Sequence, residues 1–494
     1  MNKKIKTALI SVFHKDNLED IIKLLHKHKV KIISTGGTAE FIKKLNVPVV
    51  TVESITGFPS VFGGRVKTLQ PQIFGGILNR RDNKEDQAEK AKYKIEDIDL
   101  VIVDLYPFEE TLASEASDDE IIEKIDIGGI SLIRAGAKNF NDVVIVPSKN
   151  QYLKLREILE RGNETTLEER KEFAGNAFEV SSSYDLAIHG YFQGAKLRYG
   201  ENPHQQGKFV GQMENIFDIK QGKELSYNNL LDVDAAIRLI GDFSMPAFAI
   251  LKHTNACGIA ANGNTLDLCK SALSSDPISA FGGILIANNK VDEDVAKFLI
   301  EEKKLFFEII IAPSFGNEAL EIFKKKPDIR VLEMKDVKLS TTMVRTCLNG
   351  LLVEDSDKQV DNENNMAVAT KRAPMEQEKK DLLIAAIAVK HLKSNCVAIV
   401  KNGHMLTMGA GQVSRVDALK NALEKAKGFG LDVTGGVMAS EAFFPFPDCV
   451  EIAGNAGITA VIQPGGSKND QKSIDKADEL NMAMVMTGFR HFKH

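Results

Sequence analysis

The segment Val30-Lys31-Ile32-Ile33-Ser34-Thr35-Gly36-Gly37-Thr38 decides the fold of the first part of the chain. Its apolar half is typical of a buried strand, and a helical pattern at 39–45 follows the glycine pair. A strand, a glycine-rich turn and a helix together form a geometry that binds phosphate, because the helix N-terminus offers free N–H groups. A tight turn in which Thr38 caps the helix explains the same residues equally well.

Strands and helices alternate on both sides of this segment. Apolar runs predict strands at 7–13, 98–108 and 143–147, and helical spacing predicts helices at 18–29, at 131–138 and within 150–195. This alternation predicts an α/β domain with a mostly parallel sheet that is covered on both faces. Such sheets bind ligands at the carboxyl ends of their strands. The charged helical stretch after residue 150 either packs on the domain or bridges to a partner subunit.

Polar side chains gather in the loops that follow these strands. Residues 63–71 place two cations and a hydroxyl beside a glycine pair, a composition that suits an anion better than a core. The loops near the other strands add an aromatic hydroxyl and a carboxylate. The sequence therefore predicts one cleft that is shared by Thr35, Lys67, Tyr106 and Asp126.

A lysine-histidine pair ends another apolar run in the second part of the chain. Lys252 and His253 follow the predicted strand 246–250, at a point where a rigid scaffold presents side chains to a cleft. Histidine both takes and gives a proton near neutral pH, and lysine supplies charge or a proton. Taken alone, such a pair is more often two ordinary polar residues at a strand end. Cys257 lacks zinc-binding partners, so we expect it to be a packing residue of the turn.

The second part of the chain contains two similar series of elements. A succession of helix, strand and polar turn occurs at 232–258 and again at 381–415, which indicates two related halves. Within the second series, Asn402-Gly403 predicts a hairpin. The glycine-rich turn at 409–415 is a second candidate anion site. The aromatic and proline cluster at 442–448 forms either a flat slot for a ring system or a hydrophobic plug.

The composition of the 494 residues limits the classes of function. Hydrophobic content of 43% and charged content of 27% are typical of a globular protein, and the length predicts two to four domains. A net charge of -5 argues against a general binder of nucleic acid or membrane surfaces. Neither a membrane span nor a signal peptide is expected. Five scattered cysteines and the absence of metal-binding motifs predict a reduced, cytoplasmic protein without a structural or catalytic metal.

Taken together and in order, the motifs resemble those of one enzyme family along nearly the whole chain. The matching motifs are Ser34–Thr38, Gly64–Leu69, Leu105–Phe108, Ile125–Gly129, Arg134–Asn139, Leu197–Gln205, Lys252-His253, Asp276–Gly283, Gly409–Arg415, Ser440–Asp448 and Ile458–Ser467. The chain is similar to the bifunctional purine-biosynthesis enzymes that combine AICAR transformylase with IMP cyclohydrolase. Each motif alone is weak, but so many in the same order are specific.

The resemblance implies a fold for each part of the chain. The first domain would be like methylglyoxal synthase, and the second would contain two cytidine-deaminase-like α/β subdomains without zinc. The implied boundaries are 1–195 for the cyclohydrolase domain, with a core at about 1–148 and a helical extension at 149–195, and 196–494 for the transformylase domain, with subdomains at about 196–370 and 371–494. The resemblance also implies a homodimer whose transformylase sites are shared.

In the second domain, the resemblance implies formyl transfer from 10-formyltetrahydrofolate, as co-substrate, to the 5-amino group of AICAR. That amine is a poor nucleophile, so catalysis needs a base for its proton and an electrophile. His253 would be the base, Lys252 its electrostatic and proton-donating partner, and Asn395 the holder of the formyl oxygen or of His253. The implied nucleotide-binding residues are Arg198, Tyr199, His204, Asn229 and Arg415. The implied folate-binding residues are Phe443, Phe444, Pro445, Phe446, Arg490 and His494.

In the first domain, the resemblance implies closure of FAICAR to IMP, in which the carboxamide nitrogen attacks the formyl carbon and water leaves. This reaction needs a stabilised oxyanion and proton shuttling. The implied catalytic set is Lys67, Tyr106, Asp126 and Lys138. The implied positions around the nucleotide phosphate are Lys15, Thr35, Gly37, Thr38, Arg65 and Thr68.

Several residues depart from the family's pattern. Those in the first domain are Phe13, Gln70, Asp104 and Phe140, and those in the second are Ala256, Glu441 and Pro447. The first group leaves open an alternative, in which the transformylase is kept while the first domain is a weak or lost cyclohydrolase that serves as a phosphate-metabolite binding module. The presence of the full implied catalytic set argues against that alternative, because a binding module needs no acid-base residues.

Overall fold

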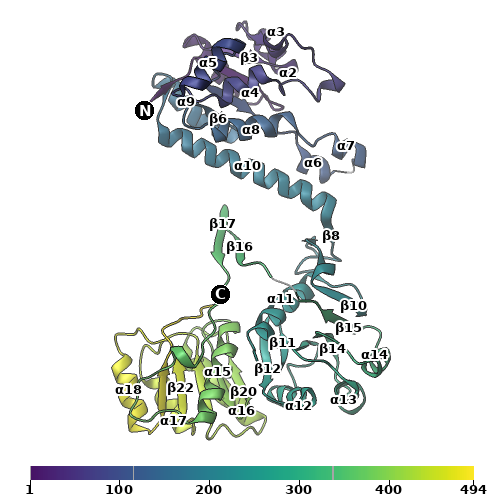
Figure 1. Cartoon of the computed structure of the whole chain (residues 1–494), viewed down its shortest axis with the longest axis vertical. Helices are drawn as coiled ribbons and strands as arrows, with labels where there is room; N and C mark the ends of the chain where they lie inside the picture. Colours follow the sequence, from purple (N-terminus) through teal and green to yellow (C-terminus); the bar gives the residue numbers. More distant parts are fainter. Residues whose placement is uncertain (1, 115, 337–338) are drawn as a thin grey trace. The chain divides into compact units, whose positions relative to one another are not determined.

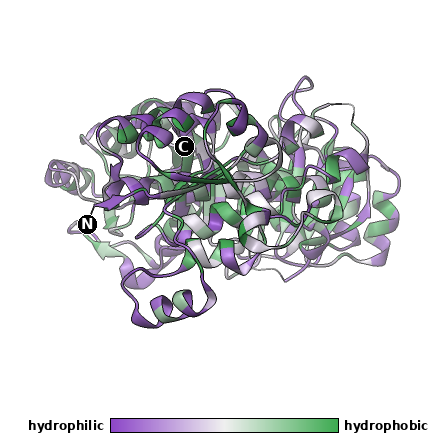
Figure 2. Ribbon diagram, turned by 90° about the horizontal axis from the view of Figure 1, so that it is seen from above, coloured by the Kyte–Doolittle hydropathy of each residue, from purple (hydrophilic) through white to green (hydrophobic). Residues whose placement is uncertain are grey.

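The computed structural model describes residues 2–114, 116–336 and 339–494, and it divides into two compact units, Met1–Gly194 and Ala195–His494 (Figure 1). Each unit has its own main sheet and its own hydrophobic core. In Figure 2 many loops are coloured as hydrophilic, while hydrophobic colour lies on strands and on parts of the helices. The predicted α/β fold class is confirmed in both units.

The first unit, called unit 1, is built on a five-stranded parallel sheet. In spatial order its strands are β4 (Val50–Thr51), β3 (Lys31–Ser34), β2 (Thr7–Ser11), β5 (Leu100–Val103) and β6 (Val144–Val146). All neighbouring pairs are parallel, so the connections cross over the faces and the central strands are continuous apolar runs. The predicted parallel sheet is confirmed, with strands shorter than the apolar runs that predict them.

Helices cover this sheet and extend beyond it. The longer helices are α1 (Leu18–Lys27), α2 (Gly36–Lys44), α4 (Pro71–Leu78), α5 (Lys84–Tyr93), α8 (Gly128–Lys138), α9 (Tyr152–Glu160) and α10 (Leu167–Gln193). The short elements are β1 (Lys3–Lys4), α3 (Val52–Thr56), α6 (Phe108–Leu112), α7 (Asp118–Ile122), β7 (Glu164–Thr165) and the 3-10 helices η1 (Phe62–Gly64) and η2 (Lys149–Gln151). Helices α9 and α10 confirm the helical prediction for the stretch after residue 150, and a capping box formed by Thr166 and Glu169 begins α10.

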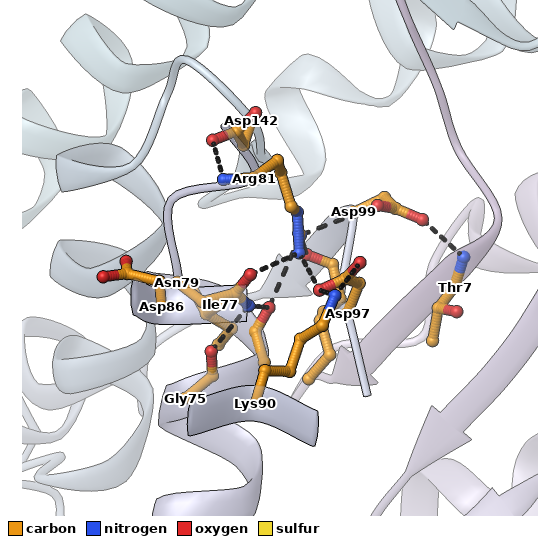
Figure 3. A network of polar contacts seen from close by, with 12 residues as sticks. Thr7, Gly75, Ile77, Asn79, Arg81, Asp86, Lys90, Asp97, Asp99 and Asp142 are labelled. Carbon is orange, nitrogen blue, oxygen red and sulfur yellow. Dashed lines mark hydrogen bonds and ion pairs between the residues drawn. The ribbon is translucent and has the colours of Figure 1, made fainter. Parts of the chain in front are cut away.

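A polar network holds together the amino ends of the unit 1 strands (Figure 3). The guanidinium of Arg81 donates to the carbonyl of Ile98 at 2.9 Å and lies 3.6 Å from the carboxylate of Asp99. Asp99 in turn accepts the backbone N–H of Thr7, at the start of β2, at 3.0 Å. Asp142 accepts the backbone N–H of Arg81 at 3.2 Å. Because these acidic residues precede strands, the network fixes the edge of the sheet that lies opposite to the carboxyl ends.

The second unit, called unit 2, is built on a twelve-stranded mixed sheet. In spatial order its strands are β10 (Phe217–Gln221), β15 (Arg330–Met334), β14 (Phe307–Ala312), β13 (Gly283–Ala287), β11 (Ala247–Lys252), β12 (Asn255–Ala261), β20 (His404–Gly409), β19 (Val397–Lys401), β21 (Val437–Ser440), β22 (Ala460–Gln463), β23 (Ala483–Met486) and β18 (Ala367–Val368). Read outward from the central pair, the order is β12-β11-β13-β14-β15-β10 on one side and β20-β19-β21-β22-β23-β18 on the other. This repeated order is the one expected if the chain contains two related halves.

The helices of unit 2 follow the same repeat. They are α11 (Tyr227–Gly241), α12 (Thr265–Ser275), α13 (Glu293–Lys297) with its continuation η4 (Phe298–Glu302), α14 (Asn317–Phe323), α15 (Glu376–His391), α16 (Arg415–Gly428), α17 (Asp448–Asn455) and α18 (Asp470–Glu479). The minor elements are β8 (Gly194–Lys196), β9 (Lys208–Val210), η3 (Met213–Asn215) and η5 (Glu363–Asn365). Helices α11 and α15 belong to one shared core cluster, so one core spans both halves of the sheet.

A hairpin between the two halves stands apart from the unit 2 sheet (Figure 1). Its strands, β16 (Thr342–Cys347) and β17 (Gly350–Asp355), pair only with each other among the described strands. Every residue of both strands is exposed, including Val344 and Val353, which lie opposite one another. An isolated two-stranded hairpin is marginally stable in water, so packing against another protein surface would stabilise this one.

Candidate active sites

A cavity of about 710 Å³ lies at the carboxyl edge of the unit 1 sheet. It is bordered by the ends of β2, β3 and β5 and by the first turns of α2 and α8. The predicted site residues that line it are Lys15, Thr35, Gly37, Thr38, Arg65, Lys67, Thr68, Tyr106 and Asp126. The single cleft predicted for the loops after these strands is thus present.

One end of the cavity is formed by the first turn of α2, which begins at Gly36. This turn contains no acidic residue, and a side chain at Gly37 would meet no atom within 4 Å. Its N-terminus therefore suits an anion. The alternative in which Thr38 caps the helix is wrong, because Thr35 occupies the N-cap position. The Thr38 hydroxyl instead donates to the carbonyl of Val12 at 2.9 Å.

The amine of Lys67 lies beside two glycines of the cavity wall. A Cβ at Gly64 would be 2.8 Å from the Nζ of Lys67, and a Cβ at Gly36 would be 3.6 Å from it. Gly64 has φ of +95°, a conformation that glycine adopts at low cost and other residues do not. The two glycines therefore make room for the Lys67 amine next to the first turn of α2.

Asp126 and Tyr106 are neighbouring titratable groups in this cavity. Asp126 is buried just before α8, and its carboxylate accepts the backbone N–H of Gly129 at 2.5 Å. Burial raises the pKa of the Asp126 carboxyl, against the opposing effect of the N–H groups that it accepts. Burial, followed by the negative charges of Asp126 and Asp104, raises the pKa of the Tyr106 hydroxyl. The pair is thus a desolvated acid-base set of the kind found at catalytic sites.

Two of the four family departures in unit 1 reach the cavity. Phe13 and Asp104 line it, whereas Gln70 and Phe140 do not. The Asp104 carboxylate accepts the backbone N–H of Phe13, and it accepts that of His14 at 2.9 Å. It also lies 3.1 Å from the ring Nδ1 of His14. Asp104 therefore anchors the loop that follows β2.

Lys138 is not brought to the cavity. It is the last residue of the 11-residue helix α8, whose first turn lines the cavity, so it lies about 15 Å away along the helix axis. The neighbouring Asn139 donates to the carbonyl of Ile77 at 2.8 Å, on the side of the polar network. Within one chain Lys138 therefore lies apart from the other implied catalytic residues, because α8 carries it to the opposite edge of the sheet, and its catalytic role stays a prediction.

Sequence reasoning missed two charged residues of the cavity wall, Glu123 and Lys124. Glu123 forms an ion pair with Arg65, and the Lys124 amine lies 5.9 Å from the ring centre of Phe13. Both immediately precede the motif that contains Asp126, and this adjacency was the available signal. Their charges, one of each sign, border the acid-base pair.

In unit 2, Lys252 and His253 occupy the end of β11 and the turn that follows it. The Lys252 amine donates to the carbonyls of Phe281 and Gly282, at 2.9 Å each. His253 and Thr254 both have positive φ, 49° and 63°. His253 is exposed, and the contacts of Lys252 place the turn at the edge of the sheet where β13 begins. A polar pair at a strand end is confirmed in its position.

Asn255 connects this turn with a second part of the site. The side-chain oxygen of Asn255 accepts the backbone N–H of Lys393 at 3.0 Å, and its amide nitrogen donates to the carbonyl of His253 at 3.0 Å. The contact places the His253 turn next to the segment that contains Asn395. The Asn395 amide nitrogen donates to the carbonyls of Gln412 and Val413 at 3.1 and 3.2 Å, so protein groups fix its orientation.

Arg415 is buried and connects this segment with the aromatic cluster. It lies 2.9 Å from Glu441, and it donates to the side-chain oxygen of Asn395 and to the carbonyl of Phe443, at 3.1 Å each. Its charge is thus already paired. The geometry suits a residue that positions Asn395 and the aromatic loop better than a residue that binds a nucleotide directly.

The aromatic cluster is only partly available to a ligand. Phe443, Pro445 and Phe446 are exposed, whereas Phe444 is fully buried in a core cluster. Neighbouring residues of an extended loop point in opposite directions, so one of them packs inward. The inclusion of Phe444 among ligand-facing residues is therefore corrected.

The C-terminal tail lies next to Asn395. The backbone N–H of Ser394 donates to the carbonyl of Lys493 at 2.9 Å, and the Lys493 N–H donates to the Ser394 hydroxyl at 3.1 Å. The buried His491 lies 2.6 Å from Asp357. These contacts dock the tail while Arg490 and His494, on either side of it, stay exposed.

The remaining predicted residues lie at the start of α11 or in the segment before it. Asn229 donates to the carboxylate of Glu308, on β14, at 2.8 Å. Asn228 donates to the carbonyl of Glu201 at 3.1 Å, which places the 196–205 segment beside the same helix end. In that segment the Arg198 guanidinium lies 5.4 Å from the Tyr199 ring centre, and His204 is exposed.

Glu308 and Asp232 are carboxylates of this region that sequence reasoning missed. Asp232 accepts the backbone N–H of Thr254 at 2.7 Å. Asp232 lies in the predicted helix that precedes the Lys252-His253 strand, and Glu308 lies in a strand, β14, that no sequence pattern had singled out.

Cys257 has the character of a packing residue. It is 5% exposed, its thiol donates to the carbonyl of Ile250 at 3.4 Å, and burial raises its pKa to about 12. Among the residues that the structure describes, no group of three or more His, Cys, Asp or Glu side chains could hold a metal ion. Among the described helices, none is both long enough and apolar enough to cross a membrane.

Comparison with known proteins gives matches along the whole chain. Residues 17–131 match the family model of the MGS-like domain, and residues 136–425 match that of the AICARFT/IMPCHase bienzyme. The bifunctional purine biosynthesis protein PurH of Bacteroides thetaiotaomicron is 53% identical over 507 residues, which cover 100% of this chain and 99% of that protein. The protein of the same name from Aquifex aeolicus is 44% identical over 511 residues, which cover 99% of this chain and 100% of that protein. A solved structure, described as the crystal structure of ForH, covers 38% of this chain and 96% of its own at 30% identity, with a TM-score of 0.34.

Proposed function

Because the chain belongs to the AICARFT/IMPCHase bienzyme family, we propose that its two activities reside at the two sites described above. The chain transfers the formyl group of 10-formyltetrahydrofolate, its co-substrate, to the 5-amino group of AICAR, and it closes the product FAICAR to IMP. The observation that carries this assignment is the 53% identity with a bifunctional relative over all of this chain and 99% of that protein.

We assign ring closure to the unit 1 cavity. The first turn of α2, open beside Gly37, would hold the nucleotide phosphate, because it offers N–H groups and no acidic side chain. Lys67 would stabilise the oxyanion that forms when the carboxamide nitrogen attacks the formyl carbon. Asp126 and Tyr106 would move protons between the attacking nitrogen and the departing water. Lys138 lies outside this cavity within one chain, and the catalytic role that the resemblance implies for it stays a prediction.

We assign formyl transfer to the edge of unit 2 around the His253 turn. His253 would take the proton of the 5-amino group as this group attacks, and Lys252 would supply positive charge beside it. Asn229 and the 196–205 segment border the same edge, which supports their role in nucleotide binding. Asn395, held by Arg415, would orient the formyl oxygen or His253. The exposed rings of Phe443 and Phe446, with Pro445, Arg490 and His494, would bind the folate.

A first domain that only binds a phosphate metabolite is not favoured. The cavity brings Lys67, Tyr106 and Asp126 together, and a pure binding site has no use for this buried acid-base pair. Phe13 and Asp104, the two departures in this cavity, line it together with these three residues. The relatives that match the full chain are also named as bifunctional.

Two further features are part of the proposal. We propose that unit 2 consists of two cytidine-deaminase-like subdomains, at about 196–370 and 371–494, which the repeated strand order supports. We also propose a cytoplasmic homodimer whose transformylase sites are shared between subunits. The fully exposed β16–β17 hairpin supports an association of copies, because its apolar residues gain from being covered.

The assignment of both activities is tested with the purified full chain. Formyl transfer is followed with AICAR and 10-formyltetrahydrofolate, and ring closure is followed separately by supplying FAICAR and recording the absorbance of IMP. Both signals are expected. If FAICAR binds and no IMP forms, unit 1 is a binding module. Sedimentation at several concentrations tests the dimer, and a monomer at all of them would refute it.

A further inference from the structure

Unit 2 contains the same tight turn twice, once in each half. In the first half, His253-Thr254 connects β11 to β12, and in the second half Asn402-Gly403 connects β19 to β20. Each turn has two central residues with positive φ, and each follows a lysine at the end of its strand. The second half is therefore an internal reference for what this turn requires.

The two turns differ in how well their residues suit that conformation. Asn-Gly is the preferred pair for a two-residue hairpin turn with positive φ at both positions. His and Thr are not, and a β-branched residue such as Thr254 is strained with φ of 63°. The first half thus keeps a turn that its own residues disfavour, and such strain persists only where the surroundings impose it.

The group that imposes the conformation is an aspartate at the same place in each half. Asp232 is the sixth residue of α11, and Asp381 is the sixth residue of α15. Asp381 accepts the backbone N–H groups of Asn402 and Gly403 at 2.8 and 2.7 Å. Asp232 accepts that of Thr254 at 2.7 Å.

In the first half this aspartate also lies near the side chains of Lys252 and His253. Burial raises the pKa of the Asp232 carboxyl, and the Thr254 N–H, His253 and Lys252 oppose that rise, while Glu308 adds to it. A histidine that takes a proton becomes positively charged, so a carboxylate beside it favours the product of that step.

We propose that Asp232 is a positioning residue for formyl transfer, which holds the strained His253-Thr254 turn so that the imidazole stays aligned with the amine of the substrate. This inference rests on the proposed role of His253. Asp381 performs the same structural task in the second half, at a turn without a histidine. It is therefore the matched control.

The test compares steady-state formyl transfer by D232A, D232N, D381A, D381N and H253A in the full chain. In D232A we expect kcat to fall about 100-fold with little change in the KM of AICAR, because a misplaced base slows the reaction without weakening binding. D232N keeps an oxygen that accepts the Thr254 N–H, so it should retain more activity than D232A. Adding T254G to D232A relieves the strain and should recover part of the lost kcat.

Thermal unfolding of the full chain, followed by circular dichroism, reports whether unit 2 of each variant is folded, because unit 2 has a hydrophobic core of its own. The inference is overturned if folded D232A keeps wild-type kcat while H253A is inactive, or if D381A loses as much kcat as D232A. If D232A does not fold, the comparison is made between D232N and D381N. A kcat for formyl transfer that is lowered in D232N and normal in D381N supports the inference. Equal kcat values in these two variants overturn it. Near-normal formyl transfer in H253A would instead refute the proposed role of His253.

Discussion

The guanidinium of Arg415 lies 2.9 Å from the carboxylate of Glu441, and both side chains are buried. The same guanidinium holds Asn395 and the carbonyl of Phe443. One buried ion pair therefore supports the polar and the aromatic sides of the proposed transformylase site.

Removal of the Glu441 carboxylate should destabilise unit 2 and stop formyl transfer. In E441A the buried Arg415 loses its partner, which typically costs about 3–5 kcal/mol of folding free energy. Denaturant unfolding measures this loss. As a control, E19A removes the exposed Glu19–Lys23 pair and should leave the stability nearly unchanged. Equal losses in the two variants would contradict the importance of the buried pair.

Gly64→Ala should impair ring closure through the Lys67 amine. The added Cβ would lie 2.5 Å from the Cε of Lys67 and 2.8 Å from its Nζ, so the flexible end of the lysine must move. A loss of about 100-fold in FAICAR cyclisation is expected, with formyl transfer unchanged.

Gly63→Ala is the matched control for this variant. Gly63 also has positive φ, but a Cβ there would meet no atom within 4 Å. It therefore imposes a similar backbone strain without displacing Lys67. Similar cyclisation rates in the two variants would show that the position of Lys67 does not matter.

Asp126→Asn should lower activity and raise stability at neutral pH. The raised pKa of Asp126 means that the folded chain holds this proton more tightly than the unfolded chain. The resulting stabilisation is complete below the ordinary Asp pKa of 3.8 and is lost as pH rises through the raised value. At neutral pH the wild-type carboxylate is therefore a buried charge that the variant lacks.

Calorimetry across the pH range checks this prediction. The melting temperature of D126N should exceed that of the wild type at about pH 7.5, and the difference should shrink towards acidic pH. FAICAR cyclisation should fall by about 10²–10⁴-fold, the usual contribution of an acid-base residue. A variant that is less stable than the wild type at neutral pH would contradict the expected direction of the stability change.

Local sequence signals were sufficient for the elements around both sites. The apolar run that ends at Ser34 and the following glycine pair predicted β3 and the open turn of α2. The Asn402-Gly403 pair predicted its hairpin for the same reason, because the backbone conformation is set by the residues themselves. In such places, the position of a strand end and of the loop after it follows from the sequence.

Tertiary packing decided what the sequence left open. Phe443 and Phe444 are adjacent and chemically identical, yet only the second is in the core, because the elements around the loop determine which side is covered. Asp126 and Lys138 are only twelve positions apart in the sequence, but they lie at opposite ends of helix α8. Asp232 and Glu308 belong to the site through partners on other elements, and no local pattern identifies such a pairing.

The central claim is that one chain performs two reactions at two separate sites. The most direct test measures both half-reactions in H253A and in K67A. We expect H253A to lose formyl transfer and to close FAICAR at the wild-type rate. We expect K67A to lose ring closure by at least about 100-fold and to keep formyl transfer. Folded variants that lose both activities together, or a variant that keeps the activity assigned to its site, would contradict this claim.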